Sequence, residues 1–334
     1  MSLSHLFDDL PDPRAANSVH KLGDVLVIMI AAVMCGRKTA TDIALFAELR
    51  RTALAPLVRY DRAPSHDTIS RLLRVLDAEA FGQVLARFAT AFARACEAQG
   101  LSEAGHVAID GKALRRACDA AQQTTPPMTL SAFASGVGLT LGVRPGPGAA
   151  GFDEGKRAVE LVDLLDLAGK IVTADALHCN RAMAGALAGQ GARYILSLRR
   201  NRAAWHDDAV AAFAAATPLC ALTEHRAHGR HERREAAVIA AATPQAPGHT
   251  AYGRIVSHRN GAPPVTRYFL LSEAFTPDVF LDLVRKHWSI ETALHWTLDV
   301  HLAEDQNRGR KDHSPANIAT LNPILRRAQL FLYL

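Results

Sequence analysis

Two stretches of sequence decide the fold: His106-Val-Ala-Ile-Asp110 and Lys170-Ile-Val-Thr-Ala-Asp175. Each is a short apolar run that ends in aspartate, which is the pattern of a buried strand. If the two strands are neighbours in one sheet, their ends bring the two carboxylates together. A helix packed on that sheet can add a third carboxylate from the side, and Glu291 is the candidate.

Further strand and helix patterns alternate around these two runs. Residues 129–135 and 139–143 predict two strands joined as a hairpin by a glycine-containing turn. Residues 154–167 and 181–189 have a helical period, and 192–198 is another strand candidate. Strands and helices in this order predict an α/β fold.

The segments on either side have different patterns of apolar and polar residues. Residues 1–100 contain apolar and amphipathic stretches without strand-like alternation, and they predict an all-helical N-terminal domain. Within it, Ser65 is expected to cap a helix. From about residue 200 to 274 the chain predicts a β-rich insertion, with strands at 233–241, 253–258 and 266–272.

The segment Thr276-Pro-Asp278 predicts the start of a helix, with threonine as the N-cap and proline in the first turn. We expect this helix to run to about Leu298 and to carry Glu291. As one α-helix, it would place His287, Glu291 and His295 on a single face.

The composition indicates a soluble globular protein. Of its 334 residues 49% are hydrophobic and 21% are charged, and the net charge of +5 suits a polyanionic partner. A mildly basic enzyme that has no polyanionic partner remains an alternative interpretation of this charge. Five cysteines, none spaced as Cys-x-x-Cys, indicate a reducing compartment. The apolar run 25–35 is shorter than the about 20 residues of a membrane span, so we expect a cytoplasmic protein.

Three converging carboxylates suit hard divalent cations such as Mg²⁺, which prefers oxygen ligands. Two such ions about 4 Å apart clamp the attacking and the leaving oxygen of a phosphodiester. Spacing alone leaves other roles open, because a strand-terminal aspartate also caps a helix or accepts a hydrogen bond from a backbone amide.

Three blocks carry a resemblance to a known family: Ala108-Ile-Asp-Gly-Lys112, Ile171-Val-Thr-Ala-Asp-Ala176 and His287-Trp-Ser-Ile-Glu-Thr-Ala-Leu-His-Trp296. They resemble the signature blocks of bacterial insertion-sequence transposases, in the branch that includes the H-repeat-associated proteins of Rhs elements. The segments Leu10-Pro-Asp-Pro-Arg14 and Pro64-Ser-His-Asp-Thr68 resemble the N-terminal domain associated with that family. The resemblance covers nearly the whole chain, in order.

The resemblance implies an RNase H-like catalytic domain in residues 105–334, interrupted by the β-rich insertion at about 200–274. It also implies that residues 1–100 form a transposase-associated domain that contacts DNA.

The same resemblance implies that Asp110, Asp175 and Glu291 are the Asp-Asp-Glu (DDE) ligands of two Mg²⁺ ions, with Mn²⁺ as a substitute. The implied reaction is hydrolysis at the terminal inverted repeats of a transposon, followed by attack of the freed 3′-hydroxyl on target DNA. A homodimer in the synaptic complex and a nucleoid-associated location in a bacterial cytoplasm are implied as well. Two alternatives stay open: an inactive or truncated relative that only binds DNA, and a general RNase H-like nuclease or junction resolvase.

Nine residues are candidates for DNA contact. Cationic and polar side chains near the carboxylates suit phosphate contacts, and an indole offers a stacking surface for a base. The alternatives are a solvated face for the cations and core packing for Trp288 and Trp296. The nine candidates are Lys112, Arg115, Arg199, Asn201, His228, Arg230, His287, Trp288 and His295.

Two further segments differ from simple strand or helix patterns. His225, His228 and His231 recur every third residue, which is compatible with a zinc site, but the alternating charges around them favour a strand bordering DNA. The segment Gly151-Phe-Asp-Glu-Gly-Lys156 stands where the family usually has a Lys-x-Asn-Glu-like block and does not match it cleanly. Thr292 also replaces the asparagine that usually follows the glutamate. These departures concern activity and not fold.

Overall fold

The computed structural model describes residues 3–58, 60–100, 105–113, 128–145, 153–227, 230–300 and 312–324. The chain divides into two compact units. The first comprises residues 1–103, 111–152 and 291–334, and the second comprises 104–110 and 153–290. Within the described ranges, no helix is both long and apolar enough to cross a membrane.

Helices dominate the N-terminal part of the first unit. Thr39 begins α2 with a capping box, in which its side chain accepts from the backbone amide of Asp42, and Ser65 caps α4 as the sequence predicts. The apolar faces of these helices form a core that includes Leu26, Ile28 and Phe81. The elements are η1 (Leu3–Phe7), α1 (Leu22–Met34), α2 (Ala40–Leu49), α3 (Arg51–Leu54), α4 (His66–Val75) and α5 (Ala78–Ala98).

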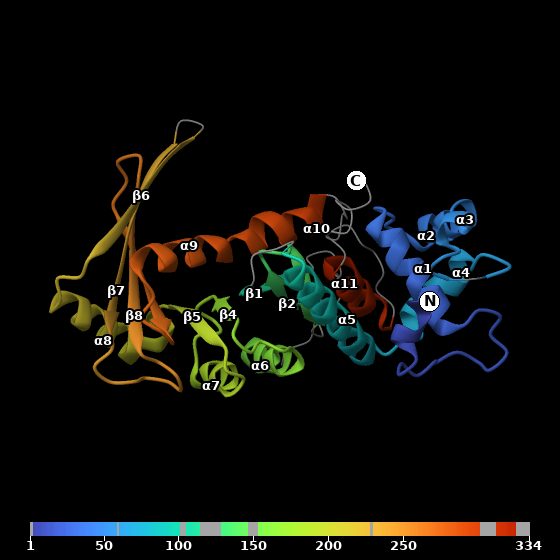
Figure 1. The fold of residues 1–334 in the computed structure, drawn as a ribbon, viewed down its shortest axis with the longest axis horizontal. Helices are drawn as coiled ribbons and strands as arrows, with labels where there is room; N and C mark the ends of the chain where they lie inside the picture. The colour runs from blue at the N-terminus through green and yellow to red at the C-terminus, as the bar shows by residue number, and fades with distance from the viewer. Residues whose placement is uncertain are drawn as a thin grey trace, which may run out of the picture. The chain divides into compact units, whose positions relative to one another are not determined.

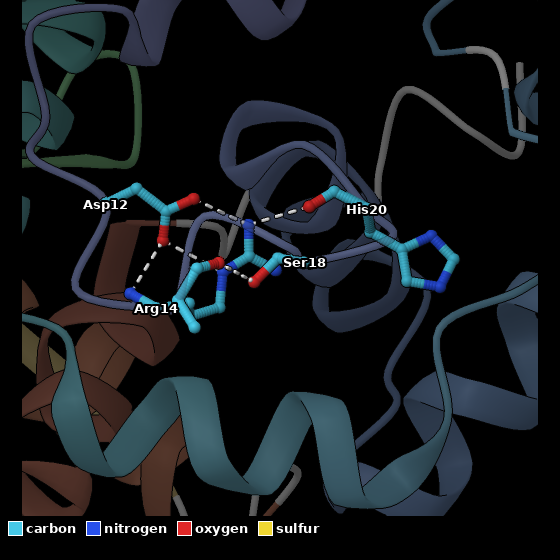
Figure 2. A network of polar contacts seen from close by, with 5 residues as sticks. Asp12, Arg14, Ser18 and His20 are labelled. Carbon is cyan, nitrogen blue, oxygen red and sulfur yellow. Dashed lines mark hydrogen bonds and ion pairs between the residues drawn. The ribbon is translucent and has the colours of Figure 1, made fainter.

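A polar network holds the long connection between η1 and α1. Figure 2 shows Arg14 between Asp12 and the backbone of His20. The guanidinium donates to both carboxylate oxygens of Asp12 at 2.9 and 2.8 Å, and to the carbonyl oxygen of His20 at 2.7 Å. This hydrogen bonding to Arg14 lowers the pKa of Asp12. The Asp-Pro-Arg segment that resembles the transposase-associated domain therefore has a structural role in closing this loop.

The first unit also contains a hairpin and two C-terminal helices. Strands β2 (Met128–Ala134) and β3 (Leu139–Pro145) pair antiparallel, as the sequence predicts. Helices α10 (Trp296–Val300) and α11 (Ser314–Ile324) follow later in the chain. The buried side chain of Asn317 in α11 donates to the carbonyl oxygens of Leu73 and Leu76, both at 2.9 Å, and so satisfies carbonyl groups at the end of α4.

A mixed sheet forms the centre of the second unit, with the strand order β1-β4-β5-β9-β8-β7-β6. The first three strands are mutually parallel, and each later pair is antiparallel. With its helices, this sheet makes the fold mixed α/β. The strands are β1 (His106–Ala113), β4 (Ile171–Ala174), β5 (Arg193–Leu198), β6 (Cys220–Ala227), β7 (Arg230–Ala240), β8 (Ala251–Arg259) and β9 (Val265–Leu271).

Helices pack on both faces of this sheet (Figure 1). On one face α9 inserts Phe280, whose ring meets that of Phe269 edge-on at 5.2 Å. On the opposite face α8 places Phe213 against Tyr268, with ring centroids 5.9 Å apart. The helices of the unit are α6 (Glu154–Leu164), α7 (Arg181–Gly189), the short η3 (Arg200–Arg202), α8 (Ala203–Ala214) and α9 (Pro277–His287).

The β-rich insertion contains more structure than the sequence predicts. The three predicted strands are present as β7, β8 and β9, but α8 and β6 were not predicted. Helix α8 is rich in alanine and buries only Ala209 and Phe213, so it has no continuous apolar stripe. Strand β6 mixes polar and apolar residues on both faces and has a clear pattern only once it is paired with β7.

The predicted single helix from residue 276 to 298 is wrong. Helix α9 ends at His287, and a π-helical turn, η4 (Ile290–His295), follows before α10. A π-helix closes i→i+5 hydrogen bonds, so it advances more residues per turn than an α-helix. Residues 287, 291 and 295 therefore do not follow the α-helical spacing that would place them on one face. Such π-helical turns are frequent at functional sites.

Candidate active site

The two aspartates lie side by side where the pairing of two neighbouring strands ends in the sheet of the second unit. Strands β1 and β4 are parallel neighbours, and their last pair is Ile109 with Ala174. Asp110 and Asp175 each come one residue after that pair, so their side chains leave the same face of the sheet. Both are partly exposed, with 31% of the Asp175 side chain accessible. The structure thus supports the predicted convergence of these two carboxylates.

A tight turn orients the Asp175 carboxylate. Its Oδ1 atom accepts a hydrogen bond from the backbone amide of Leu177 at 2.9 Å, and its carbonyl oxygen accepts from the amide of His178 at 3.2 Å. An aspartate that bonds the backbone two residues later forms an Asx turn. The carboxylate is therefore held in one orientation at the end of β4.

A second acidic group beside Asp175 was not predicted from the sequence. His178 is fully buried, and its Nε2 atom lies 3.5 Å from Glu154 Oε1 and 3.8 Å from Asp175 Oδ1. Burial raises the pKa of Glu154, and the nearby charge of Asp175 raises it further. Burial also lowers the pKa of His178. Glu154 and His178 are thus additional candidates for the site.

The local sequence explains how Glu154 reaches this position. Asp153 is the N-cap of α6, and its Oδ1 atom accepts from the backbone amide of Lys156 at 3.1 Å. Glu154 follows in the first turn, where a carboxylate is favoured by the helix dipole. Residues 153–156 belong to the segment that matches the family block poorly in sequence. They still form the capped first turn of α6 and place a carboxylate close to Asp175. An aspartate directly before a helical period was the signal that could have revealed it.

A chain of three polar side chains connects β1, β4 and α9; His106 and Thr173 are buried, and His287 is partly buried. The Thr173 hydroxyl lies 2.9 Å from His106 Nε2 and 2.9 Å from His287 Nδ1. Burial is the main cause that lowers the pKa of His106 to about 3 and that of His287 to about 4. Both imidazoles are therefore neutral at pH 7. One of the two histidines donates a ring N–H to the hydroxyl oxygen of Thr173. The ring nitrogen of the other histidine accepts the hydroxyl proton.

Several predicted DNA contacts already have partners within the protein. Lys112 is buried, and its Nζ atom lies 2.7 Å from Asp299 Oδ1 within the first unit. The Asn201 side chain donates to the carbonyl oxygen of Ala176 at 2.8 Å, which ties the turn after β5 to the loop after β4. Arg199, at the start of that turn, is exposed.

The tryptophans of the third signature block are surface residues. Trp288 is 44% exposed and Trp296 is 52% exposed, so core packing is wrong for both. The Arg267 guanidinium lies over the Trp288 ring at 5.4 Å from its centroid. His295 is partly buried in the π-helical turn.

The three-histidine zinc site finds no support. His225 pairs with Glu232 and His231 pairs with Arg226, so the two histidines point to opposite faces of the β6–β7 ladder. His228 and Arg115 lie outside the described residues, and Arg230 begins β7. Across the described part of the chain, no group of three or more His, Cys, Asp or Glu side chains is arranged to hold a metal ion.

The donors at the sheet edge nevertheless fit a hard cation. Mg²⁺ is usually held by one or two carboxylates and completes its shell with water and substrate phosphates. Asp110 and Asp175 supply two carboxylates, with Glu154 close to the second. Glu291 is exposed and begins a segment of the first unit, directly after Ile290.

Comparison with known proteins identifies the family. Residues 103–319 match the family described as the transposase DDE domain, and residues 4–89 match the one described as DDE_Tnp_1-associated. The chain belongs to the DDE transposase family. The resemblance noted in the sequence is therefore confirmed for both parts of the chain.

The chain is also similar to individual proteins. It is 28% identical to "Putative protein YbfL" of Escherichia coli strain K12, over 91% of this chain and 84% of that protein. It is 27% identical to "H repeat-associated putative transposase YhhI" of the same strain, with the same two coverages. A solved structure of a piggyBac transposase synaptic complex with hairpin DNA matches 96% of this chain and 70% of its own, with 15% identity and a TM-score of 0.42.

Proposed function

We propose that this chain is a DNA transposase that cleaves the ends of a mobile element and transfers the freed strand into target DNA. The observation that carries the proposal is the side-by-side placement of Asp110 and Asp175 in a chain of the DDE transposase family. In this proposal residues 105–334 form an RNase H-like core with the β-rich insertion at about 200–274, and Glu291 supplies the third carboxylate.

Asp110, Asp175 and Glu291 would hold two Mg²⁺ or Mn²⁺ ions. When bound, such a pair of cations supplies activation of the attacking oxygen and neutralises charge on the phosphate and the leaving oxygen. The carboxylates fit this role because they are oxygen donors on neighbouring strands, and Leu177 fixes the orientation of one of them.

The remaining contribution of the protein is positioning. Thr173 and His287 connect β4 to the end of α9, directly before the turn that carries Glu291. Asn201 holds the loop after β4 against the turn after β5. A rigid arrangement of this kind raises the rate by keeping the reacting groups in line, and a displacement of about 1 Å costs as much as 100-fold.

The proposed partner is DNA, as terminal inverted repeats and as target, and the proposed assembly is a homodimer that synapses two ends in a bacterial cytoplasm. Contacts with the DNA backbone would come from Lys112, Arg115, Arg199, Asn201, His228, Arg230, His287 and His295, and Trp288 would stack on a base. Since Lys112 is buried and paired with Asp299, its contact requires that this ion pair opens.

A cleavage and strand-transfer assay tests the proposal. Purified full-length protein is incubated with labelled DNA that carries the terminal repeats of the element, in Mg²⁺ or Mn²⁺. We expect end cleavage that Asp175→Asn lowers by about 100-fold or more while end binding is retained. A wild-type chain that binds the ends without cleaving them supports the inactive relative, and cleavage without preference for the ends supports a general nuclease.

A further inference from the structure

Arginine side chains gather on one face of the sheet in the β-rich insertion. Directly paired residues of neighbouring strands share a face, and so do alternate residues of one strand. On β8, Ser257 and Arg259 are alternate residues. Ser257 pairs with Arg234 of β7, and Arg259 pairs with Glu232. Arg234 and Arg259 therefore point to the same side.

Two more arginines join them on that face. Arg267 of β9 pairs with Ile255, which alternates with Ser257 on β8. The last pair of β5 and β9 is Leu198 with Tyr268, so Arg199 and Arg267 stand opposite each other one step further along. Arg199 has extended backbone angles, φ −128° and ψ 177°, which continue the strand. We call Arg199, Arg234, Arg259 and Arg267 the arginine face.

The arginine face has more positive charge than the protein neutralises. Glu232 accepts from Arg234 at 2.6 Å and from Arg259 at 2.8 Å, so one carboxylate serves two guanidinium groups. In the part of the chain that the structure describes, neither Arg199 nor Arg267 has a carboxylate within ion-pair distance. Like charges placed directly opposite on neighbouring strands are destabilising. Such an arrangement suits a surface that receives an anionic partner.

The electrostatics of Arg267 agree with this geometry. Burial lowers the pKa of Arg267, and Arg259, Arg199 and Arg234 lower it further, with Glu232 acting in the other direction. The four arginines are thus close enough to repel one another. An anion bound among them would relieve this repulsion.

The arginine face continues the face that carries the two aspartates. Thr173 of β4 pairs with Ile195 of β5, so Asp175 and Arg199 follow as alternate residues on that same side. Helix α9 covers the apolar part of the face, and Phe280 packs there against Phe269. At the end of α9, the half-exposed Trp288 meets Arg267. Carboxylates, arginines and an exposed indole therefore share one side of one unit.

We propose that the arginine face, together with Trp288, is the surface that binds the phosphate backbone of the DNA strand leading into the active site. A guanidinium group donates in a fork that matches phosphate oxygens, and an exposed indole stacks on an unpaired base at low sequence preference. The inference rests on the proposed function and deepens it, because it names the face of the insertion that binds the substrate.

The opposite face of the same strands provides a matched control. Arg226 pairs with His231, and Arg254 pairs with Tyr268, so both point away from the arginine face. Arg254 lies over the Phe213 ring at 4.6 Å, on the side covered by α8. Removing Arg226 and Arg254 changes the net charge by the same amount as removing Arg199 and Arg267.

The test measures binding of a fluorescent duplex with the terminal repeat by anisotropy, over a series of salt concentrations, with the full chain. Each lost phosphate contact should lower the slope of log affinity against log salt by about 1, so Arg199→Ala/Arg267→Ala should lower it by about 2. We expect Arg226→Ala/Arg254→Ala to leave the slope unchanged. The exposed Arg199→Ala alone should lower it by about 1, which covers the case in which the double variant fails to fold.

The outcomes separate this inference from the proposed function. Equal slopes for both double variants, or an unchanged slope for Arg199→Ala, overturn the arginine face while wild-type cleavage still stands. A wild-type chain with no affinity for DNA overturns both. Loss of cleavage in Asp175→Asn with an unchanged salt slope supports the separation of binding and chemistry.

Discussion

Replacing Thr173 by valine removes the hydroxyl that bridges the buried His106 and the partly buried His287. Thr173 is 2% exposed, and its Oγ1 atom lies 2.9 Å from His106 Nε2 and 2.9 Å from His287 Nδ1. Valine has nearly the same shape as threonine, so Thr173→Val leaves no cavity. It leaves one ring N–H and one ring nitrogen lone pair without a partner in the protein interior.

The size of the effect follows from these two groups. A buried donor or acceptor left unsatisfied costs about 1–3 kcal/mol, so the pair loses about 2–6 kcal/mol. Burial of the added methyl group stabilises the folded state by about 0.8 kcal/mol. We expect Thr173→Val to lower the free energy of unfolding of the second unit by about 3 kcal/mol. The matched variant Thr173→Ser keeps the hydroxyl and loses one methyl group, for about 1 kcal/mol.

The assay is hydrogen exchange of the β4 and β5 amides, which exchange through unfolding of their own unit, together with urea denaturation. In the cleavage assay, Thr173→Val should reduce the rate more than it reduces end binding, since His287 lies directly before the turn of Glu291. Equal protection in the valine and serine variants, or greater protection with valine, refutes the proposed bridge.

Three further predictions concern pH, the second acidic group and helix packing. His106 and His287 have folded pKa values of about 3 and about 4, below the unfolded value of about 6.5. Protonation therefore favours unfolding, and stability should be full above about pH 6.5 and fall below it by up to about 1.4 kcal/mol per pH unit for each histidine. Urea titrations between pH 7 and 5 should show this slope, and His106→Gln/His287→Asn should flatten it. Glu154→Gln should lower cleavage or cation affinity by about 10-fold, because Glu154 lies beside Asp175; Glu160→Gln, on the same helix and paired with Arg157, is the control, and equal effects would contradict a role at the site. Gly253→Ala should destabilise by about 1–3 kcal/mol, since its added Cβ would lie 2.5 Å from Phe280 Cζ. Gly189→Ala meets no atom within 4 Å and should leave the melting temperature unchanged or higher, and no difference between the two variants would exclude the close approach of α9.

Local patterns in the sequence were sufficient for most of the secondary structure. The apolar runs before Asp110 and Asp175 form β1 and β4, and Ser65 caps α4 where expected, but β1 continues past Asp110 to Ala113 instead of ending there. The reason is that hydrophobic period and capping depend on residues a few positions apart. Where such a local pattern is weak, as in α8 and β6, the prediction failed.

The signature blocks were sufficient for the family, but the composition of the site depended on residues far apart in the chain. His106 and Thr173 are 67 positions apart, and Thr173 and His287 are 114 apart. Glu154 lies near Asp175 only because the first turn of α6 lies beside the C-terminal end of β4. No local period indicates which residues meet across such separations.

The sequence by itself determined where the apolar strands before Asp110 and Asp175 lie, that Ser65 caps α4 and to which family the chain belongs. Only the tertiary structure decided that β1 and β4 are neighbours in register, that α9 gives way to a π-helical turn and that four arginines share the side of Asp175. The physical reason is that strand order and register are set by long-range packing of whole faces. A change of one residue in register would move every one of these side chains to the opposite side of the sheet.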